Sequence, residues 1–286
     1  MSAAPIQPAA VAGLLFNAMT WGLSWWPMRQ LHEAGLHPLW ATAIIFAVAS
    51  AAISWRSPGA WRELAGSPPL WGILLAAGTT NASFNWGVTA GDVVRVILLF
   101  YVMPLWAVVL ARLVLHEPVT RGAVLRVALG LAGAATVLWP TEPGRALAVA
   151  PVDLLGLLGG FSFAVNNILL RREAHRSGGG RGLAMFIGGC VVSTLLALTL
   201  QVDAPPAPGP WLAGAVAMGG VFLASNLALQ YGVSRLKANV TAVIMLTEVL
   251  WASGSALLLG AGVLTPQLLI GGGLILGAAA LAALRP

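Results

Sequence analysis

Residues 81–106 read NASFNWGVTAGDVVRVILLFYVMPLW, and residues 226–251 read NLALQYGVSRLKANVTAVIMLTEVLW. Identical or similar residues recur at a constant spacing of 145 positions, so that Asn81 matches Asn226 and Trp106 matches Trp251. One spacing that holds across two consecutive apolar segments indicates an internal repeat.

Each copy of this stretch carries a polar patch inside an apolar run. Asn81 and Asn85 are four positions apart, as are Asn226 and Gln230, so each pair shares one face of a helix. Amide side chains are costly to expose to lipid. The sequence therefore predicts that both faces turn away from lipid.

The composition is that of a membrane protein. Of the 286 residues, 58% are hydrophobic and 8% are charged, whereas soluble domains carry about 25% charged residues. The single Cys190 excludes an intramolecular disulfide, and the four histidines have no metal-binding spacing. We therefore expect no cofactor and no metal. The net charge of +6 comes from residues between apolar runs, so topology explains it better than binding of nucleic acid.

A membrane-spanning helix needs about 20 mostly apolar residues. The apolar runs are continuous rather than alternating, which favours helices over a membrane β-barrel. The sequence predicts an all-α integral membrane protein with ten transmembrane helices, at residues 10–31, 36–55, 69–90, 94–115, 122–139, 151–172, 181–201, 210–232, 238–260 and 265–284.

Charge predicts the orientation. One set of alternate loops and segment ends holds twelve of the fifteen basic residues, and the other set holds Arg29, Arg95 and Arg145. Because basic residues concentrate on the cytoplasmic side of membrane proteins, we expect both termini in the cytoplasm.

Each half of the chain contains five predicted spans, and five is an odd number. The repeats 1–145 and 146–286 must therefore enter the membrane in opposite directions, which makes them inverted-topology repeats of one membrane domain. The first and sixth segments match at a spacing of 142 positions, so that Trp21 corresponds to Phe163 and Ser24 corresponds to Asn166. Small residues at Gly130, Gly133 and Gly271–Gly273 predict close helix contacts in the scaffold or a contact between two copies.

The two five-span halves, Pro104, Glu248 and the turn His116-Glu117-Pro118-Val119-Thr120 resemble the drug/metabolite transporter superfamily in its ten-helix EamA-type branch. Val249 stands where that family has proline, and Gly262 stands where its second turn has glutamate. The Trp-rich first segment is similar to the YddG-type exporters of aromatic amino acids. The resemblance implies export of amino acids across the bacterial inner membrane in exchange for protons.

Glu248 and Pro104 are the candidate residues for coupling and gating. Glu248 is the only ionisable residue near the middle of a predicted helix, where a charged carboxyl costs a few kcal/mol. It is either a proton-coupling or substrate-amine site, or a packing contact between helices. Pro104 lacks the N–H that a helix interior needs, so it predicts a break that is either a gating device or an ordinary kink.

The amides and aromatic residues are the candidate substrate-binding residues. The amides line a substrate cavity or bond neighbouring helices, each such bond being worth about 0.6 kcal/mol. The aromatic residues form the apolar walls of that cavity or belong to the interfacial belt, and the depth of Trp21 favours the cavity. The candidates are Asn17, Trp21, Ser24, Asn81, Asn85, Tyr101, Phe163, Asn166, Asn226 and Gln230. Trp106 and Trp251 add aromatic area at matching positions.

These features predict a secondary-active transporter that exports aromatic and other apolar amino acids and related metabolites by alternating access. The sequence has no phosphate-binding loop G-x-x-x-x-G-K-[ST], which argues against coupling to ATP. The alternatives are an exporter of other small metabolites or drugs and, from another class, an intramembrane lipid-modifying enzyme. The nine acidic residues form no close pair, which argues against an enzyme.

Overall fold

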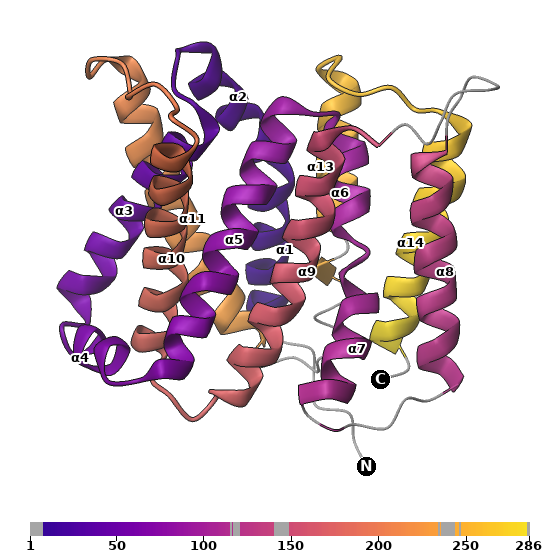
Figure 1. Ribbon diagram of the computed structural model, residues 1–286, viewed down its shortest axis with the longest axis horizontal. Helices are drawn as coiled ribbons and strands as arrows, with labels where there is room; N and C mark the ends of the chain where they lie inside the picture. Colours follow the sequence, from indigo (N-terminus) through magenta and orange to yellow (C-terminus); the bar gives the residue numbers. More distant parts are fainter. Residues whose placement is uncertain are drawn as a thin grey trace.

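The computed structural model describes residues 8–114, 116, 121–139, 149–233, 235, 244–245 and 247–284, and the regular elements in those ranges are α-helices (Figure 1). The prediction of an all-α protein is confirmed for this part of the chain. The turn at residues 117–120, Arg145 and the beginning of the ninth predicted segment lie outside it. The helices are α1 (Pro8–Leu23), α2 (Trp25–Glu33), α3 (Pro38–Arg56), α4 (Gly59–Ala65), α5 (Pro68–Ala90), α6 (Val93–Phe100), α7 (Met103–Val114), α8 (Arg121–Leu138), α9 (Pro151–Arg172), α10 (Gly178–Thr199), α11 (Pro210–Val233), α13 (Thr247–Leu258) and α14 (Pro266–Leu284).

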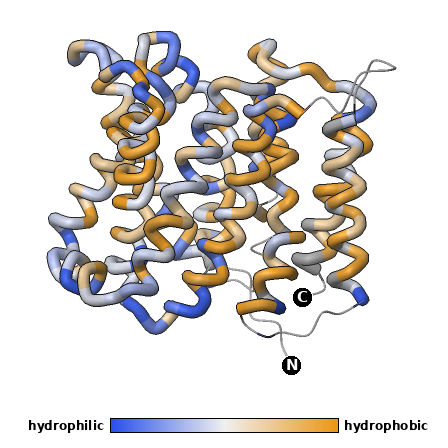
Figure 2. Tube along the Cα trace, viewed as in Figure 1, coloured by the Kyte–Doolittle hydropathy of each residue, from blue (hydrophilic) through white to orange (hydrophobic). Residues whose placement is uncertain are grey.

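The chain is a multi-pass membrane protein. Hydrophobic residues dominate the middle of the bundle, and the most hydrophilic residues gather at its two ends (Figure 2). In the described residues, five stretches are long and apolar enough to cross a membrane. They are Pro38–Arg56, Val93–Val114, Pro151–Arg172, Gly178–Thr199 and Pro210–Gly232, and shorter apolar helices lie at Val127–Val137 and Pro266–Ala278.

The first predicted segment, 10–31, is not one continuous helix. It divides into α1 and α2 at Ser24. Pro27 has no N–H to donate to the carbonyl of Leu23, four residues earlier, which explains a break at this point. The short helix α4 lies in a stretch for which the sequence predicts no helix.

The fourth predicted segment, 94–115, is also divided, because α6 ends at Phe100 and α7 begins at Met103. The Val102 N–H bonds the carbonyl of Leu99 at 3.2 Å, which tightens the turn. Pro104 cannot donate to the carbonyl of Phe100, so the expected break near Pro104 is confirmed. Its role in gating stays a prediction.

Several helices cross at glycines, where the backbones approach more closely than a side chain would allow. A Cβ on Gly133 of α8 would lie 2.6 Å from the carbonyl oxygen of Gly271 in α14, and a Cβ on Gly271 would lie 2.7 Å from that of Gly133. This confirms the close contact expected at these two residues. Gly130 and Gly273 have no atom within 4 Å of such a Cβ, so they take no part in it.

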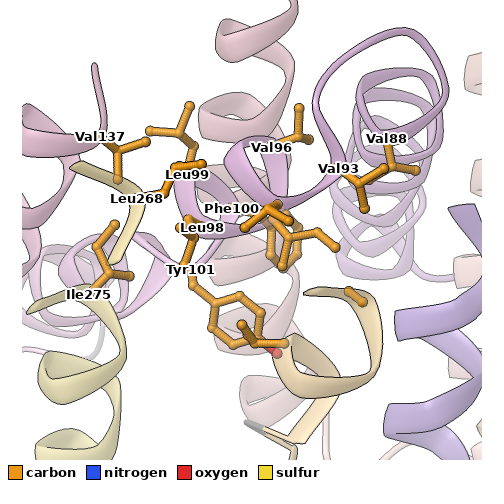
Figure 3. Close-up of a cluster of buried hydrophobic side chains, with 14 of the residues drawn as sticks. Val88, Val93, Val96, Leu98, Leu99, Phe100, Tyr101, Val137, Leu268 and Ile275 are labelled. Atoms are coloured by element: carbon orange, nitrogen blue, oxygen red, sulfur yellow. The ribbon is translucent and has the colours of Figure 1, made fainter. Parts of the chain in front are cut away.

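The largest buried cluster surrounds α6. Its side chains lie between Val137 and Ile275 on one side and Val88 on the other (Figure 3). Residues 96–102 are all buried, so the broken segment formed by α6 and α7 runs through the core of the protein.

Candidate functional site

The central polar contact joins Tyr101 to Glu248. Tyr101 lies where α6 ends, and Glu248 lies in the first turn of α13. The Tyr101 hydroxyl donates a hydrogen bond to Glu248 Oε2 at 3.1 Å. The two residues are only 3% and 8% exposed. The structure thus places a buried acid and its donor at the break in α6–α7.

The backbone of Glu248 is held by α1. A Cβ on Gly22 would lie 2.7 Å from the Glu248 carbonyl oxygen and 2.7 Å from Trp251 Cβ, so only glycine allows this approach. Among the described residues, Tyr101 is the side chain that bonds the Glu248 carboxyl. Gly22 could not be singled out from the sequence, because a glycine in an apolar helix gives no indication of what it touches.

Aromatic rings connect this pair to the rest of the bundle. Trp21 stacks on Phe222 with ring centroids 4.5 Å apart and meets Phe84 edge-on at 6.3 Å. Phe84 contacts Phe100 at 5.1 Å, and Phe100 contacts Phe163 at 5.5 Å and Tyr101 at 6.1 Å. Trp21 and Phe163 are therefore linked through Phe84 and Phe100, which the sequence did not single out. Their role as walls of a cavity stays a prediction.

The matching tryptophans Trp106 and Trp251 do not have matching environments. Trp106 is half-buried and meets Phe161 edge-on at 5.2 Å, whereas Trp251 is 41% exposed. Trp251 Cβ lies close to Gly22, and the contribution of the two tryptophans to an aromatic wall stays a prediction.

Asn17 and Asn85 bond neighbouring helices and also keep free acceptors. The Asn17 amide nitrogen donates to the Ser225 hydroxyl at 2.7 Å, and that of Asn85 donates to the Thr42 hydroxyl at 3.1 Å. The buried Oδ1 atoms of both residues, and that of Asn166, have no hydrogen-bond partner among the residues that the structure describes. A buried acceptor without a donor costs about 1–3 kcal/mol, so all three could accept from a bound ligand or water.

The second polar patch differs from the first. Asn85 is fully buried, whereas Gln230 is exposed and bonds Asn226 within α11 at 2.7 Å. Asn81 and Asn226 are half-buried, and Asn81 donates to the carbonyl of its own helix residue Ala77 at 2.7 Å. We expected the two patches to have equivalent environments. This is wrong at Gln230, which is exposed and bonds Asn226 one helical turn earlier in α11.

Ser24 is buried, but its hydroxyl donates to the carbonyl of Trp21 at 2.7 Å. This hydrogen bond gives the Trp21 carbonyl a donor at the break between α1 and α2. The local bond was not predicted, and a role of Ser24 in substrate binding stays a prediction.

A buried ion pair lies at the opposite end of α6 from Tyr101. Arg95 bonds both carboxylate oxygens of Asp153, through Nε at 2.8 Å and Nη2 at 2.9 Å. Asp153, which is 1% exposed, also accepts from the Ala150 N–H. This pair ties α6 to the beginning of α9. This ion pair could not be predicted from the sequence, because the partners are 58 positions apart.

Comparisons with known proteins agree with a transporter. The profile of the EamA-like transporter family matches residues 8–139. The chain is 36% identical over 89 residues to the protein named "Uncharacterized transporter PA0485" of Pseudomonas aeruginosa, an alignment that spans 30% of each protein. Over the first half of its length, the chain is therefore similar to EamA-like transporters, and a shorter part of it is similar to a protein named as a transporter.

A solved structure, described as "Crystal structure of protein", aligns with 97% of this chain and 97% of its own, with a TM-score of 0.61 and 19% identity. At that identity the likeness concerns the fold alone.

Proposed function

We propose that this protein is a secondary-active transporter of ten transmembrane helices that exports aromatic and other apolar amino acids and related metabolites across the bacterial inner membrane. The observation that carries the proposal is the buried Tyr101–Glu248 pair, which joins two helix ends inside a network of aromatic rings. Broken helices beside a polar site recur in secondary transporters. The cargo would be bound at this site.

The pattern of helix contacts supports two inverted repeats. If the halves are exchanged, α1 corresponds to α9, α3 to α10, α5 to α11, α6–α7 to α13 and α8 to α14. The contact of α1 with α11 then corresponds to that of α9 with α5, and the contact of α1 with α13 to that of α9 with α6 and α7. The contact of α3 with α11 corresponds to that of α10 with α5, and the pairs α3–α10, α6–α13 and α8–α14 map onto themselves.

The crossing of α8 and α14 adds a local two-fold relation. Gly133 approaches the carbonyl of Gly271 and the side chain of Ile275, while Gly271 approaches the carbonyl of Gly133 and the side chain of Val137. Each helix thus uses a glycine and the residue four positions later. Such a reciprocal contact is what a two-fold axis through the crossing produces.

The binding site would combine apolar walls with a few polar groups. Trp21 and Phe163 would bury an aromatic or aliphatic side chain. The unpartnered Oδ1 atoms of Asn17, Asn85 and Asn166 would accept bonds from the cargo. Of the other candidates, Ser24, Asn81, Asn226 and Gln230 already have bonds to their own helices or to the turn beside them, so we rank them below these three.

Coupling would depend on Glu248. A carboxyl buried in a membrane protein costs less when it carries a proton or meets a positive charge. Protonation of Glu248 and binding of a cargo amine would therefore affect one another, and bending at the break before Pro104 would open the two sides in turn. The exchanged ion would be the proton.

The expected orientation places both termini in the cytoplasm. α1 begins and α14 ends on one side of the bundle, where α4 and the connection between α9 and α10 also lie (Figure 1). That side carries the exposed Arg56, Arg62 and Arg172, in keeping with the positive-inside rule.

Aromatic amines and cationic drugs are a second cargo class. They are favoured by the acidic side chain of Glu248 and by the lack of basic residues on α1 and α13. α1 and α13 carry no basic residue, and Arg95 of α6 is already paired with Asp153. An amine would therefore find its counter-charge at Glu248, whereas the carboxylate of an amino acid would need amide or backbone donors.

The test is uptake of labelled tryptophan and phenylalanine into proteoliposomes under an imposed proton gradient, competed by a panel that includes tryptamine. We expect saturable uptake of chemically unchanged cargo, driven by a proton gradient, and loss of the gradient dependence in Glu248→Gln. Glu33→Gln is the matched control, because Glu33 is exposed at the end of α2 and bonds Gln30. Absence of uptake for every compound, or chemical alteration of the cargo, would contradict the proposal.

A further inference from the structure

The Tyr101–Glu248 hydrogen bond joins the two halves of the chain where a helix of each half begins or ends. Tyr101 caps the C-terminal end of α6, and Glu248 lies in the first turn of α13. The Tyr101 oxygen also lies 3.4 Å from the carbonyl of Met245, just before α13. Movement of α6–α7 relative to α13 must therefore stretch or break contacts made by this one hydroxyl.

The bond has no counterpart in the repeat. At the spacing of 145 positions, Tyr101 corresponds to Leu246 and Glu248 corresponds to Met103, and neither of these apolar side chains can form such a bond. Contacts inherited from duplication would occur twice, as the Gly133–Gly271 approach does. The polar pair is an addition to the scaffold rather than a part of it.

In the part of the chain that the structure describes, the helices packed against α13 bring no other charged group to the pair. α13 packs against α1 and α6. α1 has no titratable side chain, α13 has only Glu248, and α6 has only Arg95. Arg95 is near the opposite end of α6 and bonds Asp153 at 2.8 Å. Among the described residues, Tyr101 is therefore the group whose hydrogen bond changes in strength when the Glu248 carboxyl gains or loses a proton.

We propose that Tyr101 is a positioning residue for coupling, which holds the Glu248 carboxylate through its hydroxyl and locks α6–α7 to α13 until Glu248 takes up a proton or a cargo amine. This inference rests on the proposed function. A phenol donates strongly to a carboxylate and less strongly to a neutral carboxyl. When Glu248 takes up a proton or a cargo amine, the Tyr101–Glu248 hydrogen bond therefore weakens. When the proton or amine leaves, the hydrogen bond regains its strength.

The experiment measures the pH dependence of cargo exchange by wild type, Tyr101→Phe, Glu248→Gln and the double variant in proteoliposomes. Without the hydroxyl the carboxylate loses a stabilising donor, so the carboxyl keeps its proton to a higher pH. We expect the Tyr101→Phe profile to move to higher pH by about one unit. The phenylalanine ring keeps its place among the buried side chains around α6.

Glu248→Gln should remove the pH dependence, and Tyr101→Phe should then have no further effect on the profile. Tyr231→Phe is the matched control, because Tyr231 is the other tyrosine of the chain and is 40% exposed; its profile should equal that of wild type. An unshifted profile in Tyr101→Phe, or an equal shift in the Glu248→Gln background, would overturn the assignment.

Failure of this inference can be told apart from failure of the proposed function. A wild-type protein that exchanges no cargo contradicts the function, whereas exchange with an unaltered Tyr101→Phe profile contradicts only the role of Tyr101. If Tyr101→Phe folds only together with Glu248→Gln, the hydroxyl acts through the carboxylate, as proposed. If it folds in neither background, the hydroxyl has another structural role and the assignment is wrong.

Discussion

At the scale of single residues, Gly22 decides how closely α1 approaches the candidate site. Its missing side chain leaves room for the Glu248 carbonyl and for Trp251 Cβ. The position of the Glu248 backbone, and therefore the reach of its carboxyl to Tyr101, depends on that approach.

Gly22→Ala should lower both the thermal stability and the exchange rate. The added methyl group meets atoms at 2.7 Å, and overpacking of this kind costs about 1–3 kcal/mol. Gly130→Ala is the control, because a Cβ there meets nothing within 4 Å and alanine is favoured over glycine in a helix by up to about 1 kcal/mol. Melting temperatures of the purified variants check this, and equal values for the two alanine variants would contradict the contact at Gly22.

Single residues also show what a sequence can and cannot predict. Tyr101 and Glu248 could each be singled out as polar groups in apolar segments, but their bond spans 147 positions and depends on packing. Asn85 and Gln230 look equivalent in the repeat, yet one is buried and the other exposed. Residue type is visible in a sequence, whereas the partner is a property of the fold.

At the scale of elements, α4 is braced against the beginning of α10. Glu63 of α4 accepts hydrogen bonds from the hydroxyl of Ser177 and, at 3.0 Å, from its backbone N–H. The hydrogen bond from the Ser177 hydroxyl is the main cause that holds the pKa of Glu63 below its usual value of 4.5. Leu64 and Leu183 bury the apolar side of the same contact.

This brace should make stability depend on pH. A folded-state pKa below the unfolded value stabilises the fold above pH 4.5, and the contribution is lost as the pH falls through the lowered pKa. Glu63→Gln should therefore melt below wild type at pH 7, and the difference should shrink when the pH falls below 4.5. Glu33→Gln, which changes an exposed glutamate, should show neither effect. A Glu63→Gln difference that stays constant with pH would contradict the brace.

The elements were predicted well where composition alone determines them. Long apolar runs gave most helix positions, and Pro104 predicted the break before α7 because proline removes a specific backbone bond. Pro27 likewise predicted a break in the first segment, which divides at Ser24, whereas the helix α4 was missed. The segment Gly59–Ala65 has seven residues of mixed polarity and is too short to show the periodic pattern of a helix in the sequence. Contacts with α10 stabilise it.

At the scale of the whole molecule, the helices of one half pack mainly against helices of the other. α5 contacts α9 and α10, α1 contacts α11 and α13, and α8 contacts α14. The halves therefore form one body, and the proposed site lies between them. The boundary between repeats near residue 145 stays a prediction, as does their inversion.

The inversion has a direct topological consequence. Corresponding loops must lie on opposite sides of the membrane. Gly59 begins α4, in the connection between α3 and α5, and this connection corresponds to the loop after α10, which contains Asp203. Glu33 at the end of α2 corresponds to the loop after α9, which contains His175. All four residues are exposed, and a Cβ on Gly59 meets nothing within 4 Å.

The most direct test is labelling of single cysteines in intact cells with a membrane-impermeant maleimide, after replacement of Cys190 by serine. We predict that Glu33→Cys and Asp203→Cys react from outside, whereas Gly59→Cys and His175→Cys react only after the membrane is opened. If Gly59→Cys and Asp203→Cys react from the same side, the halves are not inverted and the account is contradicted.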